Sequence, residues 1–303
     1  MTTLKDLRVR IKSVKSTQKI TSAMKMVATA KLHKAQDRLE NSRAYAHGFK
    51  RSLHHALKNA QDVDPLPLLL MGGDKGVPLI LAIATDRGLC GGYNTTITRE
   101  VKALVNRIAR TNGGSGGGSA LIAAVGRKIE NNLQCDCETS KINATFFKLK
   151  TSADCVQAMA DFKHISSIAE EIADLLEAGV ISSVHVVTGH LKSIISQPIE
   201  VRQLVPFIDA PAAADDEDSP YTIFEPKPEI LMKLMLMHNF VVQLNMLFLE
   251  NSACEHAARM SAMDNATRNA RDMISNLQLR YNQGRQAQIT NELNEIISGS
   301  SAV

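Results

Sequence analysis

The sequence predicts an α/β fold combined with a long coiled coil, and three observations lead to this prediction. All nine prolines lie between residues 65 and 228, so both ends of the chain are free of this helix breaker. Both ends also repeat apolar residues at steps of three and four, the spacing of a helix with one apolar face. The middle alternates short apolar runs with helical patterns, which is typical of an α/β domain. We therefore expect the N- and C-terminal helices to form an antiparallel coiled coil that carries a central domain.

The N-terminal segment, residues 1–62, is predicted to be one long helix with an apolar seam. A helix of about 56 residues would be roughly 85 Å long. A gap of six residues between Val14 and Ile20 interrupts the steps of three and four, which predicts a slip in the register of the coiled coil. The predicted seam positions are Leu4, Leu7, Ile11, Val14, Ile20, Met24, Val27, Leu32, Ala35, Leu39, Phe49, Leu53 and Leu57.

This N-terminal helix is strongly basic. Between Leu4 and Arg38 it has ten lysines and arginines against Asp6 and Asp37, although the formal net charge of the whole chain is only +4. The composition leaves two interpretations open: a solvated face beside the coiled-coil seam, or a nucleic-acid-binding surface whose cations release counterions from phosphates. The region has no interleaved aromatic residues, which a nucleic-acid-binding surface often contains.

The central segment, residues 63–209, is predicted to be a Rossmann-like α/β domain with a mainly parallel sheet. Three apolar runs have the length and composition of buried strands, and helical patterns separate them. The predicted strands are 78–85, 120–125 and 183–188, and the predicted helices are about 94–110, 126–133 and 156–178. The Gly/Ser-rich stretch 111–120 is predicted to be a connector, and the acidic, Pro-rich stretch 210–228 a linker.

The C-terminal segment, residues 229–303, is predicted to be the second long helix. Its arginines have forked donors that suit carboxylates on a partner. Gly284 interrupts the pattern at a cost of about 1 kcal/mol relative to alanine, which predicts a less stiff end. The predicted seam positions are Ala253, Ala257, Met260, Met263, Ala266, Ala270, Met273, Leu277 and Tyr281, followed by Ile289, Leu293 and Ile296.

No set of residues predicts catalysis. The stretch TDRGLCGGYN, residues 85–94, follows a predicted strand and precedes a helix, where phosphate-binding glycines lie in nucleotide-binding folds. The spacing of Gly88, Gly91 and Gly92 matches neither G-x-G-x-x-G nor the P-loop. A structural turn with a role in contacts is therefore preferred to a phosphate site, and no cofactor is expected.

The cysteines and the hydropathy restrict the class of protein further. Five cysteines at irregular spacing favour reduced thiols, and the pair Cys135 and Cys137 lacks the further ligands that a closed zinc site needs. No stretch approaches 18 consecutive apolar residues, so no membrane span is expected.

Three separated stretches resemble the γ subunits of F-type ATP synthases, and the resemblance covers the whole chain in the same order. The stretches are LKDLRVRIKSVKSTQKITSAMKMVATAKL near the front, TDRGLCGGYN in the middle, and ACEHAARMSAMDNAT with YNQGRQAQITNELNEIISG near the end. The resemblance implies a central-stalk rotor that couples rotation of a membrane c-ring to the conformational cycle of the catalytic β subunits. ATP is then made or hydrolysed on the β subunits, and this chain is not an enzyme.

The resemblance also implies which residues meet partners. Met24, with Lys19 and Lys25 beside it, is expected near acidic loops of the β subunits, and Cys90 in the central turn near one of these loops. Glu225 is expected in the foot that faces the c-ring. The C-terminal positions expected to contact β subunits are Arg259, Arg285, Gln286, Thr290 and Glu292.

The implied partners are three α and three β subunits, the ε subunit and the c-ring, with the δ subunit as an additional candidate. The resemblance implies one copy of this chain per complex and no nucleic acid. The expected location is peripheral, on the cytoplasmic face of a bacterial inner membrane, since Met1 starts the chain without a presequence; the alternative is the matrix side of the mitochondrial inner membrane. Two other functions stay open: a nucleotide-handling α/β enzyme with a dimerising coiled coil, and a basic nucleic-acid scaffold. Such an enzyme would bind nucleotide in equilibrium dialysis, and such a scaffold would bind DNA in a salt-dependent way.

Overall fold

The structure of the chain is a computed structural model. It describes residues 4–59, 68–73, 76–111, 120–139, 142, 144–149, 162–207, 225 and 227–300. Most of the predicted connector at 111–120 and of the predicted linker at 210–228 lies outside these residues. Contacts divide the chain into two compact units: Met1–Ala30 with Arg259–Val303, and Lys31–Ala258.

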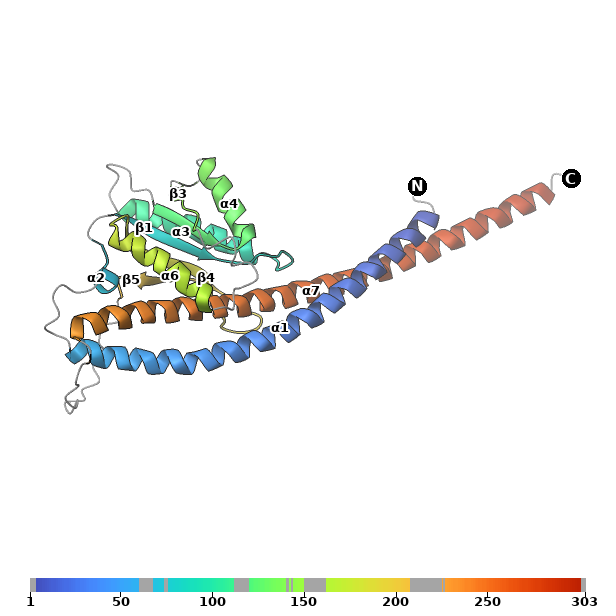
Figure 1. Cartoon of the computed structure of the whole chain (residues 1–303). Coiled ribbons are helices and arrows are strands. Elements are labelled where there is room, and N and C mark those ends of the chain that lie inside the picture. The colour runs from blue at the N-terminus through green and yellow to red at the C-terminus, as the bar shows by residue number, and fades with distance from the viewer. Residues whose placement is uncertain are drawn as a thin grey trace. The chain divides into compact units, whose positions relative to one another are not determined.

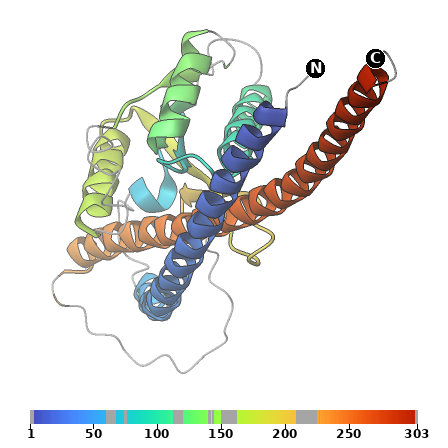
Figure 2. The ribbon, with the colours of Figure 1, turned by 90° about the vertical axis from the view of Figure 1, so that its right-hand side faces the viewer.

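Two long helices form the ends of the chain, as predicted. Helix α1 (Leu4–Asn59) and helix α7 (Pro228–Ser300) each contribute to both units, and in each unit they lie side by side and run in opposite directions (Figures 1 and 2). Pro228 begins α7, where a missing N–H breaks no helical hydrogen bond. The predicted antiparallel pairing of the terminal helices is confirmed.

The second unit contains a five-stranded sheet in the order β3-β2-β1-β4-β5. Strand β1 pairs parallel with β2 and with β4, and β2 pairs parallel with β3. Strand β5 pairs antiparallel with β4. The mainly parallel sheet was predicted, but β3 is only three residues long and β5 alternates polar with apolar residues, so neither was predicted. The strands are β1 (Val77–Ile83), β2 (Ala120–Val125), β3 (Ala144–Phe146), β4 (Ile181–Gly189) and β5 (Ile199–Val205).

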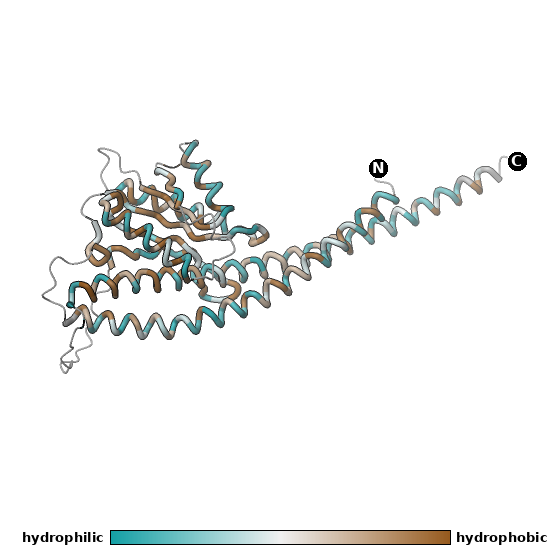
Figure 3. The backbone as a smooth tube through the Cα atoms, in the orientation of Figure 1, coloured by the Kyte–Doolittle hydropathy of each residue, from teal (hydrophilic) through white to brown (hydrophobic). Residues whose placement is uncertain are grey.

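Helices cover both faces of this sheet. One apolar core joins the sheet to α6 and to the first half of α7, and the other joins it to α3 and α4. Strands β1 and β2 are apolar at nearly every position, as expected for parallel strands buried on both faces, and they appear mostly brown in Figure 3. The remaining helices are α2 (Leu68–Met71), α3 (Tyr93–Thr111), α4 (Arg127–Glu138) and α6 (Phe162–Glu177).

Helix α7 contains an 18-residue window that is long and apolar enough to cross a membrane by length and composition alone. Core helices of folded domains meet the same criterion. Phe240, Leu244 and Leu247 of α7 are buried in the core of the sheet, which accounts for this apolar run.

In the first unit, the seam of α1 is continuous, so the predicted slip after Val14 is wrong. Ile20 and Val27 were predicted in the seam, yet each is 57% exposed. The less exposed positions instead recur at unbroken steps of three and four: Leu4, Leu7, Ile11, Val14, Gln18, Thr21, Lys25 and Ala28. Three of these positions, Gln18, Thr21 and Lys25, are polar, so a search for apolar residues did not find the seam.

The seam of α7 in the first unit needs a similar correction. Met273, predicted in the seam, is 48% exposed, and Ile289, Leu293 and Ile296 are exposed as well. These last three lie beyond Gly284, which is opposite Leu4 in the first turn of α1. The seam of α7 consists of Met263, Thr267, Ala270, Ile274, Leu277, Tyr281 and Gly284.

Gly284 has a packing role that the sequence did not indicate. A Cβ at this position would lie 3.1 Å from Cδ2 of Leu4, which is closer than ordinary van der Waals contact. The missing side chain therefore lets the first turn of α1 approach α7 closely.

Candidate functional site

Two polar contacts between α1 and α7 help hold the first unit together. The Oγ1 atoms of Thr21 and Thr267 lie 2.9 Å apart, within hydrogen-bond distance. Nζ of Lys25 lies 2.6 Å from Oδ1 of Asp264. Thr21, Lys25 and Thr267 are seam positions and Asp264 flanks the seam, where directional bonds fix the register of two helices.

The ion pair of Lys25 also involves a second cation. Arg268, one turn beyond Asp264 on α7, donates to the other carboxylate oxygen. The hydrogen bond from Lys25, and then that from Arg268, lower the pKa of Asp264 despite opposing desolvation. Lys25, a residue expected to contact a β subunit, is thus engaged within the chain, although its side chain remains 43% exposed.

The outward face of α1 near Met24 carries apolar side chains beside a free cation. Met24 itself is half-buried, whereas Lys19 is exposed and has no ion-pair partner among the described residues. Ile20, Met26 and Val27 are the large apolar residues of this face, and we call these three residues the outer stripe. The sequence pattern had assigned two of them to the seam, so this surface was missed.

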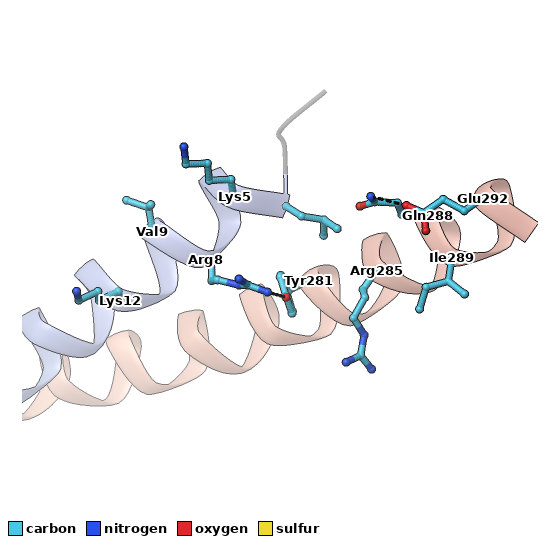
Figure 4. Close-up of a pocket in the computed structure, with 10 residues that line it drawn as sticks. Lys5, Arg8, Val9, Lys12, Tyr281, Arg285, Gln288, Ile289 and Glu292 are labelled. Atoms are coloured by element: carbon cyan, nitrogen blue, oxygen red, sulfur yellow. Dashed lines mark hydrogen bonds between the residues drawn. The ribbon is translucent and has the colours of Figure 1, made fainter.

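A groove opens between the two helices near the chain ends. Figure 4 shows Arg8 of α1 directed at Tyr281 of α7, to whose hydroxyl it donates a hydrogen bond, while Arg285 points away from this pair. The lining is mainly basic and apolar: Leu4, Lys5, Arg8, Val9, Lys12, Tyr281, Arg285, Gln288, Ile289 and Glu292. The groove brings together two of the predicted contact residues, Arg285 and Glu292.

The predicted contact residues at the end of α7 are all exposed. Gln286 and Thr290 lie one turn apart, and Thr290 Oγ1 donates to the Gln286 carbonyl at 2.9 Å. Gln288 donates to Glu292 at 2.9 Å, which leaves that carboxylate with one local partner. Arg259 is half-buried, and Glu225, which belongs to the second unit, is exposed.

The turn at 85–94 is held by its own hydrogen bonds. Nδ2 of Asn94 lies 2.8 Å from Oγ1 of Thr85, and Thr85 Oγ1 donates to the Arg87 carbonyl at 2.8 Å. Cys90 is only 3% exposed, so its thiol is buried beneath this turn. Its neighbour Leu89 is exposed and has φ of 66°, a left-handed conformation that is uncommon for a leucine.

A side chain of this turn also occupies the N-terminus of the neighbouring helix α4. The backbone N–H of Arg127, at the start of α4, donates to Oδ1 of Asp86 at 3.1 Å. Burial raises the pKa of Asp86, although the bond from Arg127 opposes this. A carboxylate at a helix N-terminus fills the site where an anion would bind. Among the described residues, no group of three metal-ligating side chains comes together.

Comparison with known proteins places these features in a family. The family model described as "ATP synthase" matches residues 3–303. The ATP synthase gamma chain of Granulibacter bethesdensis is 42% identical over 312 residues, and that of Paramagnetospirillum magneticum 40% identical over 306 residues. In both cases the alignment covers the whole of each chain.

Solved structures share the fold at lower identity. A chain of the Tetrahymena thermophila mitochondrial ATP synthase central stalk and c-ring is 24% identical with a TM-score of 0.53, covering 82% of this chain and 99% of that one. A chain of the Euglena gracilis mitochondrial ATP synthase in rotational state 3 is 19% identical with a TM-score of 0.61, covering 99% and 94%.

Proposed function

The chain belongs to the family of ATP synthase gamma chains, the non-catalytic rotor subunits of the central stalk, and we propose that it turns as a single copy inside a ring of three α and three β subunits. It is part of a proton-transporting ATP synthase complex. The further partners in this proposal are the ε subunit and the membrane c-ring, with the δ subunit as an additional candidate.

The observation that carries this proposal is the antiparallel pair of helices in the first unit. Its seam is closed by apolar and polar contacts within the chain, yet its outer stripe and the end of α7 leave large apolar residues exposed. Exposed apolar surface of this extent is typical of a protein that works inside an assembly.

Co-purification tests the proposed assembly. An affinity-tagged chain expressed in its own cell should bring down two larger P-loop subunits in threefold excess over itself, as quantified by mass spectrometry. Recovery of the tagged chain as a soluble homodimer without these subunits would reject the proposal.

The proposed β contacts are Lys19, Met24, Lys25, Cys90, Arg259, Arg285, Gln286, Thr290 and Glu292, with Glu225 toward the c-ring. Lysines on flexible stems attract acidic loops without locking into one geometry, which suits a surface that must slide past three β subunits. The burial of Cys90 makes exposed Leu89 the side chain through which the central turn would touch a partner.

Charge reversal tests the basic face of the shaft. Lys19→Glu combined with Lys25→Glu should lower proton-driven ATP synthesis in membrane vesicles, because two attractive charges become repulsive toward acidic loops. Screened charges of this kind each contribute about 1 kcal/mol or less, so we expect a reduction of roughly three- to tenfold.

The intrachain ion pair requires a matched control. Asp264→Asn removes the partner of Lys25 without reversing any charge on α1, and it should leave ATP synthesis near that of the parent complex. Unchanged synthesis in the double reversal would count against the β contacts, and an equal loss in Asp264→Asn would assign the effect to the seam instead.

The proposed location is peripheral, on the cytoplasmic face of a bacterial inner membrane. The relatives at 38–42% identity are bacterial gamma chains, which supports a bacterial complex over the mitochondrial alternative. Fractionation should find the chain on membranes and release it with the catalytic head at low ionic strength.

A further inference from the structure

Helix α7 carries two buried polar residues in succession, Glu250 and Asn251, at the edge of the sheet formed by the carboxyl ends of its parallel strands. Their exposed fractions are 5% and 0%, and Glu250 is the one charged residue classed as buried in the described part of the chain. The preceding turns of α7 are apolar and pack against the sheet. A buried carboxylate and a buried amide are costly unless both are fully hydrogen-bonded, so their partners show what they hold.

Glu250 holds the hairpin formed by β4 and β5. Its Oε1 lies 2.6 Å from Nδ1 of His190, just after β4, and its Oε2 lies 3.3 Å from Nη1 of Arg202, on β5. The backbone N–H of Leu191 donates to the same carboxylate at 3.4 Å. Arg202 also pairs with Glu200 at 3.1 Å, which orients its guanidinium. The carboxylate therefore ties α7 to both strands of the hairpin, whose loop lies beside α7 in Figures 1 and 2.

Asn251 holds the other side of the same edge. Its Oδ1 accepts a hydrogen bond from the hydroxyl of Tyr93, the first residue of α3, at 2.8 Å. Its Nδ2 donates to the carbonyl of Ala84, directly after β1, at 3.3 Å. Burial raises the pKa of Tyr93 well above its usual value, so the hydroxyl remains a donor. A Cβ at Gly189 would collide with the Tyr93 ring, so glycine is needed there to admit it.

Glu250 and Asn251 attach α7 to the α/β domain in two different directions. Consecutive side chains on a helix diverge by about 100°, so Glu250 and Asn251 reach different elements of the sheet. Apolar packing is non-directional, whereas hydrogen bonds weaken steeply when their angle changes. Rotation of α7 about its own axis would therefore break these bonds before it separated the apolar surfaces.

We propose that Glu250, Asn251, His190, Arg202 and Tyr93, here called the anchor, form the junction through which the α/β domain and helix α7 exchange torque. The proposal rests on the rotor function of the chain. The anchor residues position α7 and touch no nucleotide, so their loss should reduce coupling rather than catalysis.

Other polar contacts of α7 in this unit are weaker candidates. Lys233 pairs with Glu177 at 2.8 Å, but both side chains are more than half exposed, and such pairs contribute little. His238 lies 2.8 Å from the hydroxyl of Tyr45 on α1, in an exposed position. Charge-assisted hydrogen bonds to a buried carboxylate are the stronger class.

The test compares coupling with catalysis in the complete ATP synthase. The variants are Glu250→Gln, His190→Leu and, as the mildest change, Tyr93→Phe. ATP hydrolysis by the detached catalytic head should remain at the parent rate. Protons pumped per ATP hydrolysed in sealed vesicles should fall roughly twofold or more, because the strongest bonds at the junction are missing, and the deficit should grow as the opposing proton gradient rises.

Two controls separate torque transmission from simple destabilisation. Leu244→Val truncates a fully buried residue of the same helix and should lower the melting temperature of the complex at least as much as Tyr93→Phe, while pumping per ATP stays at the parent value. His190→Lys places a hydrogen-bond donor opposite Glu250 and should preserve coupling that His190→Leu loses.

The outcomes are distinguishable. If all three anchor variants pump as the parent does, or if Leu244→Val loses coupling in proportion to its lost stability, the anchor is only structural and the proposal is wrong. In either case the rotor function stands, because the parent complex pumps. If the complete complex instead assembled and pumped protons in the absence of this chain, the rotor function would be rejected.

Discussion

Cys254 illustrates how burial controls the chemistry of a single side chain. It lies on α7, one turn beyond Glu250, and is fully buried. Burial, with a smaller contribution from the carboxylate of Glu250, raises the pKa of its thiol to about 12. At pH 8 only about one thiol in ten thousand would be the reactive thiolate.

Alkylation of the native complex at pH 8 should therefore label exposed Cys135 and leave Cys254 unmodified, as read by peptide mass spectrometry. Labelling of Cys254 should appear only when the complex is unfolded. Equal labelling of the two cysteines in the native state would show that the α7 core opens far more readily than its packing indicates.

Sequence reasoning succeeded unevenly at the scale of residues. The turn at 85–94 was predicted from its position after a strand, but the burial of Cys90 was not, because a glycine-rich turn has no apolar periodicity that distinguishes the buried Cys90 from the exposed Leu89. The pairing of Glu250 with His190 and Arg202 joins residues that are 60 and 48 positions apart in the chain. Only the fold brings these partners together, so no local pattern could reveal them.

At the scale of elements, the long helices were predictable because prolines are confined to residues 65–228 and apolar steps persist at both ends. The seam register was not, because Gln18, Thr21 and Lys25 occupy three successive seam positions. Extending the steps of three and four beyond Val14 without requiring apolar residues would have identified it. Strand β3 escaped detection because three residues carry too little pattern.

Gly284 provides a test at this scale. Gly284→Ala should stabilise the end of α7 by up to about 1 kcal/mol, since alanine favours the helix and the contacting atom is the flexible end of Leu4. Hydrogen exchange of the amides around residue 284 should slow accordingly in the assembled complex.

The double variant Gly284→Ala with Leu4→Ala is the matched control, because it removes the close contact and should slow exchange at least as much. Faster exchange in Gly284→Ala alone would show that Leu4 cannot move aside and that close approach outweighs helix propensity.

At the scale of the whole molecule, apolar residues that the sequence pattern assigns to the core can lie on the surface, where partners can bind them. Ile20 and Val27 of the outer stripe are examples. Ile20→Thr combined with Val27→Thr should change the stability of the chain by no more than about 0.5 kcal/mol, because both side chains are exposed. The same variant should weaken co-purification with the larger subunits or lower ATP synthesis, because the outer stripe loses its apolar groups.

Leu32→Ala is the contrasting variant, since Leu32 is 1% exposed and its truncation should cost about 2–5 kcal/mol of stability. Thermal denaturation of the purified chain distinguishes the two. A large loss of stability in the Ile20 and Val27 variant would mean that these residues belong to the seam after all.

The end of α7 has a consequence for the living cell. Ile289, Leu293, Ile296 and Ile297 form a row of apolar side chains along α7, and each of them is more than two-fifths exposed. Copies synthesised in surplus over their binding partners would stick to one another or to unrelated proteins. Because of this apolar row, the cell must produce the subunits in matched amounts or degrade unassembled copies of this chain rapidly.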